Sequence, residues 1–250
     1  MMKKLPELLP EYTITPASLP PCPVRWREVM GWFIVPQVGE KVAWAEYDLP
    51  SRKRSDYVEM EAVGKALIHG IEGVEVHSNT NDQGGFHFVV QQTEDHCRYL
   101  AESHMENGVH QFTTFLDGDS FLTDWGFGPD NCGHEINLSA KGRIRLAGNS
   151  LTSAQAGDVV DLVQRCTVTI LGKSYDTVRL FYLDGQNQVA SEQYLDKQGR
   201  TILWRRFNHN NWAQERYQKP WTELLPDNDR LTINGETYVH WYDCITDYIL

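Results

Sequence analysis

The sequence predicts a mainly β protein: a large curved antiparallel sheet or partly closed barrel with a few short helices. From Trp26 onward it is dense in aromatic and β-branched residues, which is typical of strands. Short turn sequences interrupt these runs, and two of them, Asn107-Gly108 and Asn234-Gly235, have the composition that two-residue hairpin turns prefer. Helical periodicity is rare along the chain.

The first 25 residues differ from the rest of the chain because they contain six prolines, at positions 6, 10, 16, 20, 21 and 23. Proline lacks the N–H that a helix interior or a central strand requires. We therefore expect residues 1–25 to form an extended arm on the surface of the body, with at most a short turn of helix at its start. Residues 26–250 contain no internal repeat and no clear linker, which predicts a single β-rich domain.

The Asn-Gly turns also predict strand register. If Asn234-Gly235 forms the loop, Ile233 pairs with Glu236 and Leu231 pairs with Tyr238. Asn107-Gly108 predicts an equivalent hairpin. Further candidate turns are Gly84-Gly85, Asp117-Gly118 and Asp184-Gly185.

Residues 158–207 have the pattern of a meander. Its strands are expected at 159–171, 175–183, 189–195 and 201–207, with turns at Gly172-Lys173, Asp184-Gly185 and Lys197-Gln198-Gly199. The second of these strands has apolar residues on both faces, so we expect both faces to be covered.

Two further segments depart from the simple strand pattern, and the first of them allows two interpretations. Residues 93–105 fit either a capped helix or the strand that leads into the Asn107-Gly108 hairpin, and the strand is favoured. Residues 208–229 are expected to form a turn and a short helix that cover a sheet edge.

The meander includes Tyr194-Leu195-Asp196-Lys197-Gln198-Gly199-Arg200-Thr201, an aromatic strand that ends in a turn and returns as a strand. This hairpin resembles the recurring hairpin of lipoprotein-carrier and sigma-regulator half-barrels, the LolA/RseB-like group. The resemblance implies a strongly curved antiparallel sheet around an apolar, lipid-sized hollow. It covers a small part of the chain, and no functional residue is carried over from it.

Composition restricts the possible partners and the compartment. With 23 Lys+Arg and 34 Asp+Glu the net charge is −11, which argues against nucleic acid and anionic membrane surfaces as partners. Charged residues interrupt every apolar run, so no membrane span is expected, and the N-terminal residues lack the apolar core of a secretory signal. Five widely spaced cysteines, with no Cys-x-x-Cys pair, fit free thiols in the cytoplasm.

The main candidate site is a cluster of histidine and glutamate. If residues 74–77 and 86–90 form a hairpin, His77 lies opposite His87 and Glu75 lies opposite Val89. Glu75, His77 and His87 then share a polar face, with His69 as a further candidate ligand. Such a face suits a divalent metal or general acid–base chemistry, and it is also what the water-exposed face of a one-sided sheet would carry. The other face would carry Val74, Val76, Phe86, Phe88 and Val90.

Two other groups of residues can be considered for chemistry. Cys132, His134 and Glu135 could supply a nucleophile, a base and an orienting carboxylate, but a buried free thiol with a nearby exposed histidine is the favoured interpretation. His240 and Asp243 could form a dyad in the aromatic C-terminal segment, which we expect to dock into the core. A satisfied core histidine is the favoured interpretation of His240.

The sequence favours one of two function classes. The first is a non-enzymatic protein that holds a small hydrophobic ligand or a protein segment in a sheet-lined cavity, which the 28 aromatic residues and the lack of catalytic motifs favour. The alternative is a metal-assisted hydrolase or isomerase that uses His77, His87, Glu75 and His69. Retained metal or ligand in the purified protein would discriminate between them.

Overall fold

The computed structural model confirms a mainly β protein. It describes residues 4–16, 22–25, 33–80, 85, 87–92, 97–107, 109–114, 135–138, 142–146, 159–183, 189–209, 211, 215, 218–219, 223 and 229–250. The strands are β1 (Tyr12–Pro16), β2 (Cys22–Arg25), β3 (Lys41–Asp48), β4 (Arg54–Ile68), β5 (Ile71–Thr80), β6 (His87–Gln92), β7 (Cys97–Glu106), β8 (Val109–Thr114), β9 (Glu135–Leu138), β10 (Gly142–Leu146), β11 (Val159–Ile170), β12 (Lys173–Leu183), β13 (Val189–Leu195), β14 (Thr201–His209), β15 (Arg230–Ile233) and β16 (Glu236–Thr246), and the 3-10 helix η2 (Asp247–Ile249) follows β16.

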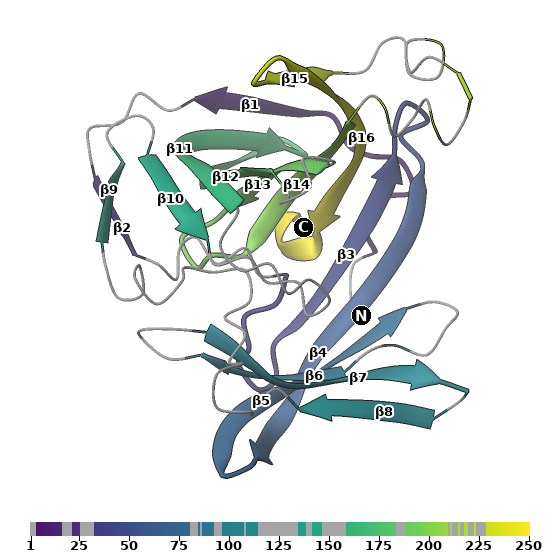
Figure 1. Cartoon of the computed structure of the whole chain (residues 1–250), viewed down its shortest axis with the longest axis vertical. Coiled ribbons are helices and arrows are strands. Elements are labelled where there is room, and N and C mark those ends of the chain that lie inside the picture. Colours follow the sequence, from purple (N-terminus) through teal and green to yellow (C-terminus); the bar gives the residue numbers. More distant parts are fainter. Residues whose placement is uncertain are drawn as a thin grey trace.

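Two antiparallel meanders make up one large sheet. Its path runs β1-β11-β12-β13-β14-β16-β3-β4-β5-β6-β7-β8, with β10 beside β11 and β15 beside β16. Strand β16 joins the two meanders because it pairs with β14 on one side and with β3 on the other. Figure 1 shows the first half curling around the C-terminal end of the chain, while β5 to β8 form a layer below it. The separate pair is β2 with β9.

One hydrogen bond shows how strongly the half of the sheet from β1 to β16 curls. The Tyr12 hydroxyl on β1 donates to the Asp243 carboxylate on β16 at 2.7 Å, although four strands lie between them in the sheet order. Within the described residues β1 and β8 remain the two ends of the path, so the sheet is strongly curved and not closed. The expected curved sheet is therefore confirmed.

The inner face of the curl holds a large apolar cluster. Ile249 of η2 is fully buried in it, which confirms that the C-terminal segment docks into the core. The cluster comprises Leu5, Leu9, Ala45, Tyr47, Cys166, Val168, Ile170, Tyr194, Ile202, Leu203, Ile245 and Ile249.

The proline-containing arm is anchored more deeply than expected. Lys4, Glu7, Leu8 and Glu11 are exposed, as in an arm on the surface, but Leu5 and Leu9 are buried in the core cluster. The carbonyl oxygens of Leu5 and Leu9 accept hydrogen bonds from the guanidinium groups of Arg54 and Arg52, at 2.9 and 3.0 Å. An arm held through its carbonyls does not need the N–H groups that prolines lack, so the prolines are compatible with burial.

The hairpin predictions are largely confirmed. Asn234 and Gly235 both have positive φ, and Ile233 pairs with Glu236. Asn107 also has positive φ, between the paired residues Glu106 and Val109.

The first turn of the meander is displaced by one residue. Leu171 and Gly172 form it, with φ of 51° and 74°, and Lys173 begins β12. A two-residue turn of this kind needs positive φ at both positions, and Leu171 adopts it although it is not glycine.

Other expectations fall partly inside the described residues. The segment 93–105 contributes to strand β7, not to a helix. Thr177 and Val178 on β12 are both buried although they point to opposite faces, so both faces of that strand are covered as predicted. The proposed turns at Asp117-Gly118 and Asp184-Gly185, and most of 208–229, lie outside the described residues.

Candidate metal centre

Strands β5 and β6 pair in the register that the sequence predicts. His77 is opposite His87, and Glu75 is opposite Val89. On the other face, Val76, Phe88 and Val90 are buried, as the alternation requires. The burial of that face keeps the two histidines and the glutamate together on the opposite one.

The three side chains converge closely. One potential ligand atom from each of Glu75, His77 and His87 lies within 4.8 Å of the others. The His77 Nε2 atom lies 2.6 Å from a Glu75 carboxylate oxygen, and the rings of His77 and His87 stack with centroids 3.7 Å apart and an interplanar angle of 7°. The side chains of His77 and Glu75 are about one-third exposed, at 34% and 32%, so solvent ions can reach them.

This donor set fits a divalent transition metal. Imidazole nitrogen and carboxylate oxygen bind zinc at about 2.0–2.2 Å, which places two tetrahedral ligand atoms about 3.4 Å apart. The 2.6 Å contact between His77 and Glu75 is shorter than this, because in the absence of metal the two groups share a hydrogen bond. Binding would require the His77–Glu75 hydrogen bond to open and the stacked rings to turn, because the lone pairs of two parallel imidazoles do not point at one ion. Three protein ligands would leave a coordination position open.

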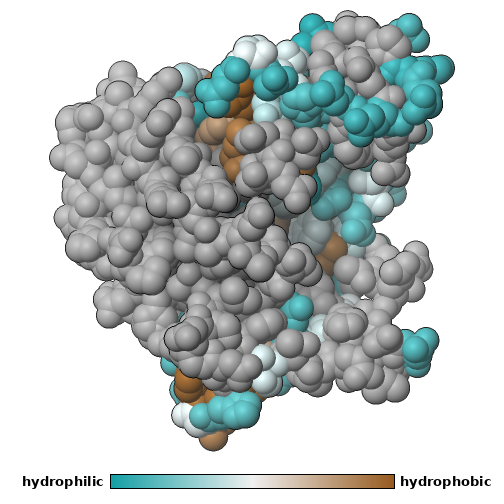
Figure 2. Space-filling view, in the orientation of Figure 1, coloured by the Kyte–Doolittle hydropathy of each residue, from teal (hydrophilic) through white to brown (hydrophobic). Residues whose placement is uncertain are grey.

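His69 does not belong to the centre. It lies in the turn between β4 and β5, with φ of 46°, beside the terminal pair Ile68 and Ile71. His77 is six residues beyond Ile71, or about 20 Å along an extended strand. The turn lies at the lower tip of the molecule, where Figure 2 shows hydrophobic and hydrophilic side chains next to each other. Leu67, two residues before His69, is largely exposed. The sequence prediction that His69 could join the site is therefore wrong.

Cys132 and His134 lie outside the described residues, and only the backbone of Glu135 is described, at the start of β9. The structure therefore leaves the proposal of a cysteine nucleophile as a prediction.

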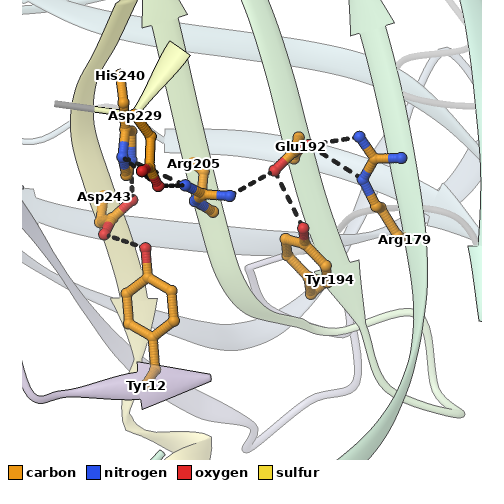
Figure 3. A network of polar contacts seen from close by, with 8 residues as sticks. All are labelled: Tyr12, Arg179, Glu192, Tyr194, Arg205, Asp229, His240 and Asp243. Atoms are coloured by element: carbon orange, nitrogen blue, oxygen red, sulfur yellow. Dashed lines mark hydrogen bonds and ion pairs between the residues drawn. The ribbon is translucent and has the colours of Figure 1, made fainter. Parts of the chain in front are cut away.

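A second polar cluster, which the sequence does not predict as a unit, crosses the inner face of the curled half (Figure 3). Glu192 on β13 lies between two arginines: Arg179 on β12 donates to one carboxylate oxygen, and Arg205 on β14 donates to the other at 3.0 Å. The Tyr194 hydroxyl also donates to Glu192, at 3.0 Å. Arg205 extends the network by donating to Asp229 at 2.6 Å.

His240 and Asp243 form the other end of this network. The His240 Nε2 atom lies 2.6 Å from Asp243 Oδ1, while Arg205 Nη2 lies 3.4 Å from His240 Nδ1. Because a guanidinium can only donate, Nδ1 accepts and Nε2–H donates to Asp243. Tyr12 donates to the second Asp243 oxygen. His240 therefore matches both interpretations from the sequence, because it pairs with Asp243 and is also a buried histidine whose two ring nitrogens have partners.

The tyrosines of this network remain protonated donors. Burial, followed by the charge of Asp243, raises the pKa of Tyr12 well above its usual value. Burial and the neighbouring Glu192 raise the pKa of Tyr194 in the same way. A cavity of about 260 Å³ borders the network at Tyr12, Asp229, His240 and Asp243. The network's hydrogen bonds are made within the chain, and this favours a structural role for it.

Glu46 on β3 provides a separate test of electrostatics, because it lies directly opposite Asp56 on β4. Burial, followed by repulsion from Asp56, raises the pKa of Glu46, and Arg206 opposes the rise. The folded state therefore keeps this proton to higher pH than the unfolded chain, and it loses stability as pH rises through the window above the usual glutamate pKa.

We expect Glu46→Gln to increase Tm at pH 7 but not below the usual glutamate pKa. Thermal unfolding at several pH values measures this, with exposed Glu72→Gln as control. Equal Tm changes at both pH values would contradict it.

No known protein family, curated protein or solved structure matches the chain. Among the described residues, no helix is both long enough and apolar enough to cross a membrane.

Proposed function

We propose that the protein binds a divalent transition metal ion, with zinc as the reference ion, through Glu75, His77 and His87. The observation that carries this proposal is the convergence of three potential ligand atoms within 4.8 Å on two paired strands. Mixed imidazole and carboxylate ligands suit zinc and its neighbours better than they suit magnesium or calcium, which prefer oxygen ligands alone.

The open coordination position gives this proposal a chemical direction. Zinc with three protein ligands can hold a water molecule and lower its pKa, or it can polarise a carbonyl group. This supports a metal-assisted hydrolase or isomerase as the reaction class. The competing expectation, a hydrophobic ligand or protein segment in a sheet-lined cavity, remains a prediction. In the described residues, Leu5, Leu9 and Ile249 fill part of the inner face where such a ligand would lie.

Zinc addition is expected to raise the Tm of the protein. Protein purified without chelator should contain metal by elemental mass spectrometry, and after its removal, zinc at 100 times the dissociation constant should stabilise the fold by about 2.7 kcal/mol. His87→Ala and Glu75→Gln should abolish the zinc-dependent increase, because each removes one of three ligands.

A second His–Glu pair provides the matched control for this experiment. His209 Nε2 lies 3.0 Å from a Glu236 oxygen, but no third ligand accompanies this pair among the described residues. Glu236→Gln should therefore keep the full zinc response. A metal-free preparation with no zinc-dependent change in Tm, or an unchanged response in His87→Ala, would contradict the proposal.

A further inference from the structure

The metal centre belongs to a row of directly opposed residues that crosses three strands. Glu61 on β4 lies opposite His77 on β5, and His77 lies opposite His87 on β6. Directly opposed residues of antiparallel strands have Cα atoms about 4.5–5.5 Å apart and point to the same face. Glu61 therefore flanks His77 on the side away from His87, on the face that carries the centre.

Glu61 is the acidic residue of β4 best placed to reach a metal ion. Glu59 points to the same face, but it is opposite Asn79, one pair farther along the strands. The Glu59 carboxylate is also within 3.5 Å of the Tyr57 hydroxyl. A zinc ion bound by only three side chains would have a coordination position free for a carboxylate from the Glu61 position.

Lys41 holds Glu61 when no metal is bound. The Lys41 ammonium on β3 lies 2.9 Å from a Glu61 oxygen, and both side chains are about half exposed. Exposed ion pairs of this kind contribute little to stability. Transfer of the Glu61 carboxylate from the ammonium to a doubly charged ion is therefore inexpensive.

We propose that Glu61 is a fourth ligand of the metal centre and that Lys41 competes with the metal for its carboxylate. This inference rests on the proposed function, because it concerns the same metal ion. It makes the site a Glu2His2 centre whose affinity is set partly by a neighbouring ion pair. Because Glu61 then fills the position that Glu75, His77 and His87 leave open, water or substrate would bind the metal only when the Glu61 carboxylate has returned to Lys41.

The two residues are expected to act in opposite directions on zinc affinity, measured by calorimetry on the full chain. Glu61→Gln should weaken zinc binding about 10- to 100-fold, the range found when groups that support a metal site are lost. Lys41→Met should tighten binding about twofold to fivefold, which is the fold-change that corresponds to an exposed ion pair. In the double variant, Lys41→Met should have no further effect, because its target is gone.

Matched controls separate ligation from general charge effects. Glu59→Gln removes the same charge from the same strand and face. The Lys65–Glu72 pair, at 2.7 Å, is a similarly exposed ion pair that joins β4 to β5, as Lys41–Glu61 joins β3 to β4. Glu59→Gln, Glu72→Gln and Lys65→Met should each change affinity less than twofold. With Co²⁺ as a probe, the visible spectrum should change in Glu61→Gln and not in Glu59→Gln. The Tm of each metal-free variant checks its fold.

The outcomes distinguish the two proposals. Zinc binding that is lost in His87→Ala but unchanged in Glu61→Gln would keep the metal centre and overturn the role of Glu61. An equal loss in Glu59→Gln and Glu61→Gln would overturn it too, since charge alone would explain both. A Lys41→Met effect that persists in the double variant would overturn the competition. Absence of zinc binding in the unmodified protein would overturn the proposed function itself.

Discussion

A chain that ends at Tyr238 is expected not to fold. The last dozen residues include most of β16, the strand that joins the two meanders by pairing with both β14 and β3. They also include buried apolar side chains such as Ile245 and Ile249. Each large buried side chain that is lost costs about 2–5 kcal/mol, and the total stability of a domain is only about 5–15 kcal/mol. Circular dichroism and soluble yield measure the outcome.

A graded variant shows whether packing or truncation itself is responsible. Ile249→Ala removes one fully buried side chain from the same segment and leaves β16 complete. It should lower the free energy of unfolding by about 2–5 kcal/mol and still give a folded protein. A soluble truncated chain with cooperative thermal unfolding would show that the C-terminal segment is not required for the fold.

Glu192→Gln is expected to be the most destabilising single substitution in the buried network. The carboxylate has 4% side-chain exposure and receives hydrogen bonds from Arg179 and Arg205. An amide would remove the carboxylate that pairs with Arg179 and would leave Arg205 paired only with the exposed Asp229. Breaking a buried ion pair in this way costs about 3–5 kcal/mol. Urea unfolding monitored by tryptophan fluorescence measures the change.

Asp229→Asn is the matched control for Glu192→Gln. Asp229 also pairs with Arg205, but its side chain is 71% exposed. Exposed pairs contribute about 0–1 kcal/mol, so this variant should remain close to the parent protein. If both variants lost the same small amount of stability, the arginines would have to be satisfied by other groups.

The cluster of Glu75, His77 and His87 was largely predictable from the sequence, because local rules determine it. A short connection between two strands sets their register, and alternation then places His77 opposite His87. The same rules place Glu61 only when the β4–β5 register is known. That register contains an irregularity between Ala62 and Gly64, and the sequence does not reveal it.

The error at His69 has a different cause. Its spacing from His77 fits strand alternation, but alternation says nothing about where a strand ends. The chain reverses at His69 and Gly70, both with positive φ. Alternation would place His69 on the same face as His77 only if the strand continued back to residue 69, but β5 begins at Ile71.

The buried network was not predictable because it depends on the curl of the sheet. Arg179, Glu192 and Arg205 each lie on a strand of the expected meander, but the hairpin turns only bring their strands together, and a shift of one residue would separate the side chains. The contact between Tyr12 and Asp243 depends on curvature alone, since their strands are not neighbours in the sheet. A charged residue at a core-facing position of β13 is the feature that could have indicated the network.

The bond between Tyr12 and Asp243, 231 residues apart in the chain, has a consequence for the order of folding. Long-range contacts of this kind slow folding, because the entropy of loop closure must be lost before they form. During synthesis, β3 to β8 emerge well before β16 and can form their hairpins, while the β3 edge stays without its β16 partner until β16 leaves the ribosome. The contact between β1 and β16 cannot form before β16 has been synthesised, so β1 waits for its tyrosine's partner through most of the synthesis of these 250 residues.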